Sequence, residues 1–217
     1  MVSIFRIALI LALFFAATFL ALKFTGFFSI EAIESYLEQA QQTETRFLFL
    51  LVVLLLFSDL FIAVPTLTIT ILSGYFLGFV TGGLAAIIGM LLAGIAGYGI
   101  SWRYGEFLLK KIVRSETKRQ EAIASFNRYG TGMILLSRVS PILPEVSACL
   151  AGIVRMPFPM FFLTWSVNTI PYGLIAAYSG SVSSLNDPKP AIYAAIGLYF
   201  SLWLAWFLFR RHIRPGK

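Results

Sequence analysis

The sequence predicts an all-α polytopic membrane protein, and its composition and apolar runs lead to that fold class. The mean hydropathy is +0.84, and only 12% of the 217 residues are charged, against about 25% in a typical soluble domain. Apolar runs long enough to cross a bilayer, roughly 17–25 residues, recur along the chain. We therefore expect one integrated membrane domain and no sizeable soluble domain.

The first region, residues 1–46, is predicted to hold an N-terminal transmembrane helix and an outer segment. The apolar run at residues 4–28 exceeds the apolar core of a signal peptide, about 7–15 residues, so we expect a retained helix. Residues 29–46 place glutamates between apolar residues at helical spacing. This pattern predicts a short amphipathic helix on the outer side.

The membrane topology of the core region, residues 47–181, is predicted from the number of times the chain must cross the membrane. Residues 47–102 join the outer segment to a basic loop expected inside, so they cross an odd number of times. This segment is too short for three full crossings with loops between them. Its length fits one hairpin that enters and leaves the membrane on the same side, followed by one transmembrane helix. We expect the hairpin at residues 47–80, turning at Pro65, and the helix at residues 84–102.

The same count applies to residues 131–181. It predicts a second hairpin from the opposite side, turning between Pro141 and Pro144, and a transmembrane helix at residues 158–181. The two halves form an inverted repeat of opposed re-entrant helical hairpins, with which many transporters build a site at the membrane midplane. Residues 182–217 add a C-terminal transmembrane helix and a basic tail.

The net charge of +7 does not indicate nucleic-acid binding, because the basic residues gather where the positive-inside rule expects them. Seven lie in a polar loop at residues 103–130, and four lie in the tail "RRHIRPGK". We expect the loop, the tail and both chain termini to be cytoplasmic.

The sequence offers little for enzyme chemistry. One Cys and one His exclude an intramolecular disulfide and a metal or triad cluster. No phosphate-binding loop, hydrolase motif or metalloprotease motif occurs. We therefore expect no enzyme activity, no cofactor and no metal site.

Two prolines, Pro141 and Pro144, interrupt the stretch "LLSRVSPILPE". Each lacks a backbone N–H and breaks helix hydrogen bonding, and irregular backbone at membrane depth is tolerated only inside protein or along a wet cavity. We expect a buried re-entrant turn; a kinked ordinary helix is the alternative. Pro65 marks the corresponding turn of the first hairpin.

Three ionisable residues lie near the two predicted turns: Asp59, Arg138 and Glu145. Ionisable residues at membrane depth are functional hypotheses by default, and opposed hairpins bring their tips together near the midplane. An Arg at a broken-helix turn suits a phosphate or carboxylate, and a carboxyl group in a poorly solvated cavity can load and release a proton. The alternative is a buried ion pair that only fixes the packing.

Two further polar residues are weaker candidates. Asn168 can hydrogen-bond to a hairpin tip, although a purely structural bond between helices is an equal alternative. Arg155 is close enough to the cytoplasmic interface to reach it by snorkelling.

The motifs "SGYFLG", "SWRYG", "RYG", "LLSRVSPILPE" and "AGIVRMPFPMFF" together resemble the DedA / VTT-domain superfamily, also called SNARE-associated Golgi proteins. The resemblance covers residues 47–181 and is closer to the yeast-Golgi-type branch than to DedA proper. DedA proteins usually have a second Arg where this chain has Pro144 and Glu145. The family's essential Arg matches Arg138, and its membrane-embedded acids match Asp59 and Glu145.

The resemblance implies two opposed re-entrant hairpins and lipid transport. Bacterial members are associated with returning undecaprenyl phosphate across the inner membrane, dependent on the proton motive force, and eukaryotic members resemble phospholipid scramblases. We therefore expect a translocase or scramblase for an anionic lipid headgroup, with Arg138 on the phosphate and Asp59 and Glu145 in proton coupling. The partners are membrane lipids and protons, and the small-residue faces would suit a homodimer.

Two other functions stay open. The same residues would serve a proton-coupled transporter of a small anion or a metal oxyanion. They would equally suit a non-transporting membrane scaffold, in which the buried charges only hold the helices together.

Overall fold

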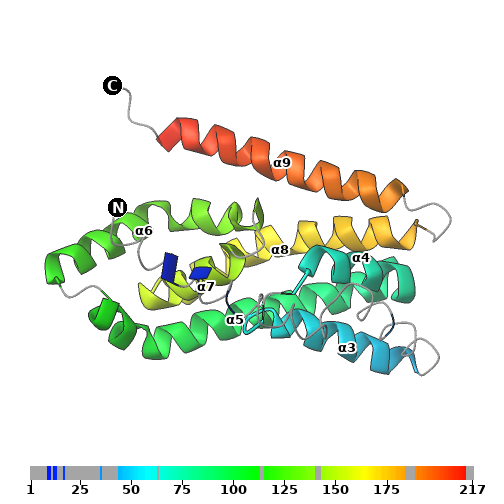
Figure 1. Ribbon diagram of the computed structural model, residues 1–217, viewed down its shortest axis with the longest axis horizontal. Helices are drawn as coiled ribbons and strands as arrows, with labels where there is room; N and C mark the ends of the chain where they lie inside the picture. Colours follow the sequence, from blue (N-terminus) through cyan, green and yellow to red (C-terminus); the bar gives the residue numbers. More distant parts are fainter. Residues whose placement is uncertain are drawn as a thin grey trace.

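The computed structural model describes residues 9–10, 12–13, 17, 35, 44–62, 64–112, 115–139, 143–183 and 189–213 (Figure 1). All regular structure in these residues is helical, and the described residues from 44 onward comprise seven α-helices and one short 3-10 helix. The prediction of an all-helical chain is confirmed for them. The expected N-terminal helix and amphipathic segment lie largely outside the described residues.

The first half of the core is a helix pair followed by one long helix. Helix α3 (Thr45–Ser58) and helix α4 (Thr66–Leu77) are separated by residues 59–65, and α5 (Phe79–Ile112) follows. The break lies just before the predicted turn, because Pro65 takes the N-cap position of α4. Gly78, with φ +77°, then divides α4 from α5 in a conformation that favours glycine.

The basic segment at residues 103–130 is mostly helical, so the prediction of a loop is wrong for its described part. Helix α5 continues to Ile112, and α6 (Glu116–Leu135) begins a few residues later. Arg, Lys, Glu and Gln are strong helix formers. Glu116 additionally pairs with Arg119 and accepts a 3.1 Å hydrogen bond from Gln120, which are contacts across one helical turn.

The second half repeats the pattern of a broken helix pair. After α6, the 3-10 helix η1 (Ser137–Val139) leads to α7 (Leu143–Ile153). Pro144 lies in the first turn of α7, where a missing N–H costs no helix hydrogen bond. Pro141, the other predicted breaker, lies outside the described residues.

A left-handed residue ends α7. Arg155 has a φ of +57°. The N–H of Met156 donates to the carbonyl of Ala151 and that of Arg155 to Gly152, at 2.9 and 3.0 Å. This pair of bonds is the Schellman motif, and it turns the chain toward α8.

Helices α8 and α9 complete the chain. Helix α8 (Phe158–Ser181) has the bounds that the sequence predicts, and α9 (Lys189–Ile213) lies within the predicted C-terminal region. The α8 segment and residues Phe79–Gly105 of α5 are each long and apolar enough to cross a membrane. Helices α3 and α4, with 14 and 12 residues, are too short to cross roughly 30 Å of hydrocarbon alone.

The long helix α5 connects the two halves. Its N-terminal part packs against α3 and α4, and its C-terminal part packs against α7. Figure 1 shows α3 and α4 toward one end of α5 and α6 and α7 toward the other, with α8 running between them and α9 along the outside. Each half has its own hydrophobic cluster, and α8 contacts both.

Glycines let α4 and α8 touch backbone to backbone. A Cβ added to Gly74 would collide with the carbonyl oxygen of Ala177, and one added to Gly180 would collide with that of Ile71. Small residues at a helix interface permit such approach in membrane proteins. The first helix pair is thereby held directly against a helix of the second half.

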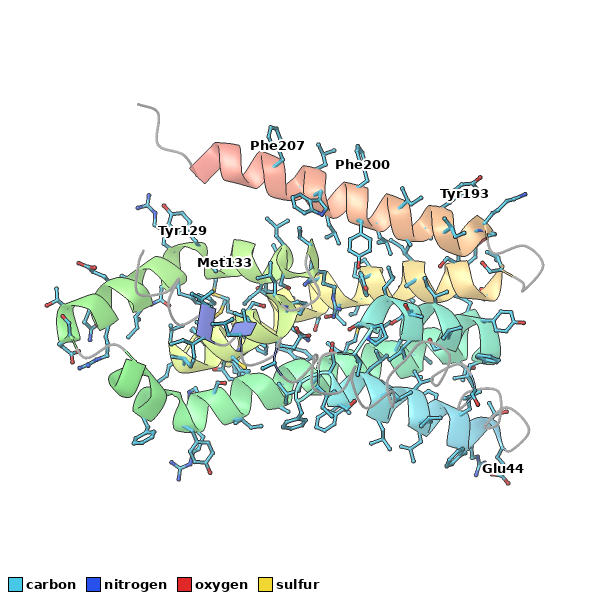
Figure 2. The ribbon with its side chains drawn as sticks, in the orientation of Figure 1. Glu44, Tyr129, Met133, Tyr193, Phe200 and Phe207 are labelled. Atoms are coloured by element: carbon cyan, nitrogen blue, oxygen red, sulfur yellow. The ribbon has the colours of Figure 1, made fainter. Side chains whose placement is uncertain are left out.

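The outer face of α9 is apolar. Figure 2 shows Phe200 and Phe207 on the side of α9 that points away from α8. Both side chains are more than half exposed, as are Tyr193 and Trp203 on the same helix. This composition suits contact with lipid.

Candidate functional site

Arg138, a residue of η1, is buried against α8. Only 7% of its surface is exposed. Its Nη2 donates a 3.3 Å hydrogen bond to Oγ1 of Thr169. Its guanidinium carbon lies 4.5 Å from the ring centroid of Tyr172 and 6.0 Å from that of Trp165. No carboxylate of the described residues is in ion-pair contact with it.

One face of α8 forms the wall of this site. Trp165, Asn168, Thr169 and Tyr172 follow the spacing i, i+3, i+4, i+7, so they lie on one side of the helix. Asn168 donates to the carbonyl of Ile134 at 2.9 Å and to Oγ of Ser137 at 3.1 Å. It therefore fixes the backbone from which Arg138 projects, so the bond to a hairpin tip expected for Asn168 exists.

Asp59 fastens the break between α3 and α4. It is buried, and its Oδ1 accepts a 2.9 Å hydrogen bond from the N–H of Val64. Its Oδ2 accepts a 2.8 Å bond from the hydroxyl of Thr66. Asp59 thus closes the turn that contains Pro65.

Glu145 lies in the first turn of α7, directly after Pro144, and is 8% exposed. Its carboxyl group is close enough to that of Asp59 for the two acids to interact electrostatically. Two buried carboxyl groups that lie this close are costly to ionise together.

The structure brings together the three charged residues that the sequence predicts at the turns. Arg138 is close enough to attract both Asp59 and Glu145 electrostatically, although the predicted direct ion pair is absent among the described residues. Two buried atoms of this cluster have no hydrogen-bond partner there: Nε of Arg138, a donor, and Oε2 of Glu145, an acceptor. The cluster can thus offer both a donor and an acceptor to a bound group.

Arg155 is not part of this cluster. It follows the C-terminal end of α7, whereas Glu145 lies at the N-terminal end, so the length of the helix, about 15 Å, separates them. Its side chain is exposed and lies over the ring of Trp102, at 5.5 Å.

Sequence reasoning missed Trp165, Thr169 and Tyr172. Aromatic and hydroxyl residues are ordinary in an apolar helix, so none of them stands out singly. Their helical spacing from Asn168 was the available signal. In the part of the chain that the structure describes, no three His, Cys, Asp or Glu side chains gather in a metal-binding group.

Comparison with known proteins adds a family and one relative. The family model of the VTT domain matches residues 64–182, more than half of the chain. Undecaprenyl phosphate transporter A of Bacillus subtilis (strain 168) is 29% identical over 112 residues, which are 48% of this chain and 54% of that protein. The chain thus matches about half the length of this curated relative. No solved structure matches.

Proposed function

The chain belongs to the VTT domain family, and from this premise we propose that it moves the phosphate headgroup of an anionic lipid across a membrane. One observation carries the proposal. Arg138 is buried among apolar helices and contacts no carboxylate of the described residues. A buried cation is costly unless something compensates its charge, and a phosphate would supply that compensation.

The guanidinium has the geometry for this task. It offers five N–H donors in a planar fork that matches phosphate oxygens. Thr169 takes one donor, and Nε has no partner among the described residues. A phosphate bound along the Nε edge would form charge-assisted hydrogen bonds, which are stronger than neutral ones.

Glu145 supports the proposal as a proton carrier next to the phosphate. It lies close to Asp59 and keeps Oε2 unpartnered among the described residues. A proton taken up and released by this carboxyl group would let the site change its charge as the headgroup arrives and leaves. Coupling to a proton gradient follows from the same arrangement.

The relative suggests the class of lipid. Undecaprenyl phosphate transporter A is named for a polyprenyl phosphate, and we extend to this chain either that class or an anionic phospholipid. The proposal places the protein in a bacterial inner membrane with both termini cytoplasmic. The lipid tails would stay in the bilayer while the headgroup passes the cluster of Asp59, Arg138 and Glu145.

The test is headgroup flipping in proteoliposomes. Labelled polyprenyl phosphate and labelled phospholipid are assayed in parallel, with and without a pH gradient. Arg138→Ala is compared with wild type and with Arg128→Ala, which removes an exposed Arg from α6. We expect Arg138→Ala to insert and fold but to lose flipping, while Arg128→Ala flips as wild type does.

Two results would contradict the proposal. Normal flipping by Arg138→Ala would show that Arg138 is no receptor. Folded wild-type protein that flips neither lipid but takes up inorganic phosphate would instead identify a transporter of small anions.

A further inference from the structure

We infer that Tyr172 is a positioning residue, which holds the guanidinium of Arg138 ready for an anion without neutralising its charge. The inference rests on the proposed function, because it assigns a role toward the receptor of that function. It adds to the site a residue of α8 that is in direct contact with neither Asp59 nor Glu145.

The geometry begins with the ring of Tyr172. Its centroid lies 4.5 Å from the guanidinium carbon of Arg138, well within the distance of about 6 Å for a cation–π interaction. Trp165 lies at 6.0 Å, at the edge of that range, and its indole N–H is already donated to the carbonyl of Met90. Tyr172 is therefore the principal aromatic contact of Arg138.

Every described direct contact of the guanidinium is electrically neutral. The contacts are the aromatic rings and the hydroxyl of Thr169. A carboxylate in direct contact would occupy the donor fork that a phosphate needs, and the phosphate would first have to break that ion pair. Asp59 and Glu145 attract Arg138 without contacting it among the described residues. The arrangement leaves both the charge and the fork of Arg138 available.

An aromatic ring and an anion use different parts of a guanidinium. A ring attracts the cation through its π face, whereas an anion needs N–H groups in the plane of the fork. Nε, on that plane, has no partner among the described residues. Tyr172 can therefore stay in contact with Arg138 while a phosphate is bound.

Helix α8 gives this contact a fixed position. Asn168, one turn before Tyr172, holds the backbone of η1 through Ile134 and Ser137. The same helix face thus fixes both the backbone before Arg138 and the direction of its side chain. Such support from neighbouring residues is what a binding geometry requires.

The experiment measures flipping rate against the mole fraction of labelled polyprenyl phosphate in proteoliposomes. The variants are Tyr172→Leu, which removes the ring, and Tyr172→Phe and Tyr172→Trp, which keep one. Tyr178→Leu removes an exposed Tyr from the same helix and is the control. Thermal unfolding in detergent shows whether each variant is folded.

We expect Tyr172→Leu to raise the mole fraction for half-maximal rate roughly tenfold, with a smaller change in the maximal rate. Tyr172→Phe and Tyr172→Trp should restore it to within about threefold of wild type. Tyr178→Leu should match wild type. If Tyr172→Leu does not fold, Tyr172→Met replaces it with the same expected result, because Met also lacks a ring and its flexible side chain fills irregular space.

Two outcomes overturn the inference. A folded Tyr172→Leu that matches wild type shows that the ring does not position Arg138. Equal losses in the Leu, Phe and Trp variants show a role that does not depend on an aromatic face. Arg138→Ala separates the two proposals. If it abolishes flipping while folded Tyr172→Leu matches wild type at every mole fraction, only this inference fails. Normal flipping by Arg138→Ala removes the proposed function itself.

Discussion

Asp59 and Glu145 belong to different helix pairs, yet their buried carboxyl groups are close enough to interact electrostatically. Asp59 ends α3 and uses both oxygens to bind Val64 and Thr66. Glu145 begins α7 and keeps Oε2 unpartnered among the described residues. The two acids therefore differ in their tasks: Asp59 builds a turn, and Glu145 faces the site.

Asp59→Leu should destabilise the protein. Leu has a similar size and no acceptor, so the N–H of Val64 and the hydroxyl of Thr66 both lose their bond to this side chain. An unsatisfied buried polar group costs about 1–3 kcal/mol, and thermal unfolding in detergent would report the loss. Thr66→Val, which removes one of the same bonds from the other side, should lower the unfolding temperature by a similar or smaller amount. Unchanged stability in both variants would contradict the turn-building role.

Glu145→Gln should change transport more than stability. Gln has nearly the shape of Glu but cannot release a proton, so we expect the variant to fold and to lose the response of flipping to a pH gradient. The measurement is the ratio of flipping rates with and without the gradient, in wild type and in the variant. A variant that responds to the gradient as wild type does would exclude Glu145 as the proton carrier.

Gly74→Ala should loosen the contact between α4 and α8. The added methyl group would meet the carbonyl of Ala177, a backbone atom that cannot turn aside. Forcing an extra carbon into a close-packed interface costs about 1–3 kcal/mol. Gly99→Ala is the matched control, because a Cβ on Gly99 meets nothing within 4 Å. A lower unfolding temperature for Gly99→Ala than for Gly74→Ala would refute this account of the interface.

Arg155→Gly should be more stable than Arg155→Ala. Both variants lose the contact with Trp102, so their difference isolates the backbone conformation, with φ at +57°. A left-handed conformation costs a non-glycine residue about 1–2 kcal/mol. Unfolding temperatures of the two variants give the comparison, and equal values would mean that the turn adapts to its residue.

The charged members of the site were predictable because charge is rare in this chain. Asp59, Arg138 and Glu145 each interrupt an apolar stretch near a proline, and opposed turns were expected to bring them together. Their exact pairing was not predictable, because it depends on how the turns pack. The sequence favours an ion pair between Arg138 and an acid, whereas in the structure the direct contacts of Arg138 are neutral: the hydroxyl of Thr169 and the rings of Tyr172 and Trp165.

The basic segment shows where sequence reasoning fails for a physical reason. Its polarity indicates that it lies outside an apolar layer, but polarity alone does not decide between a loop and a helix. Helix formation depends instead on side-chain entropy and local pairs, and residues such as Glu116 and Arg119 satisfy both requirements. Location relative to a membrane and secondary structure are therefore separate predictions.

The backbone contact between Gly74 and Ala177 has a consequence for how the protein is made. Ala177 is synthesised about 100 residues after Gly74, which at roughly 5–20 residues per second is a delay of about 5–20 s. During that delay α4 can pack against α3 and α5 but not against α8. Ribosome-bound chains that end before α8 should therefore be cleaved by membrane proteases faster than chains that include it.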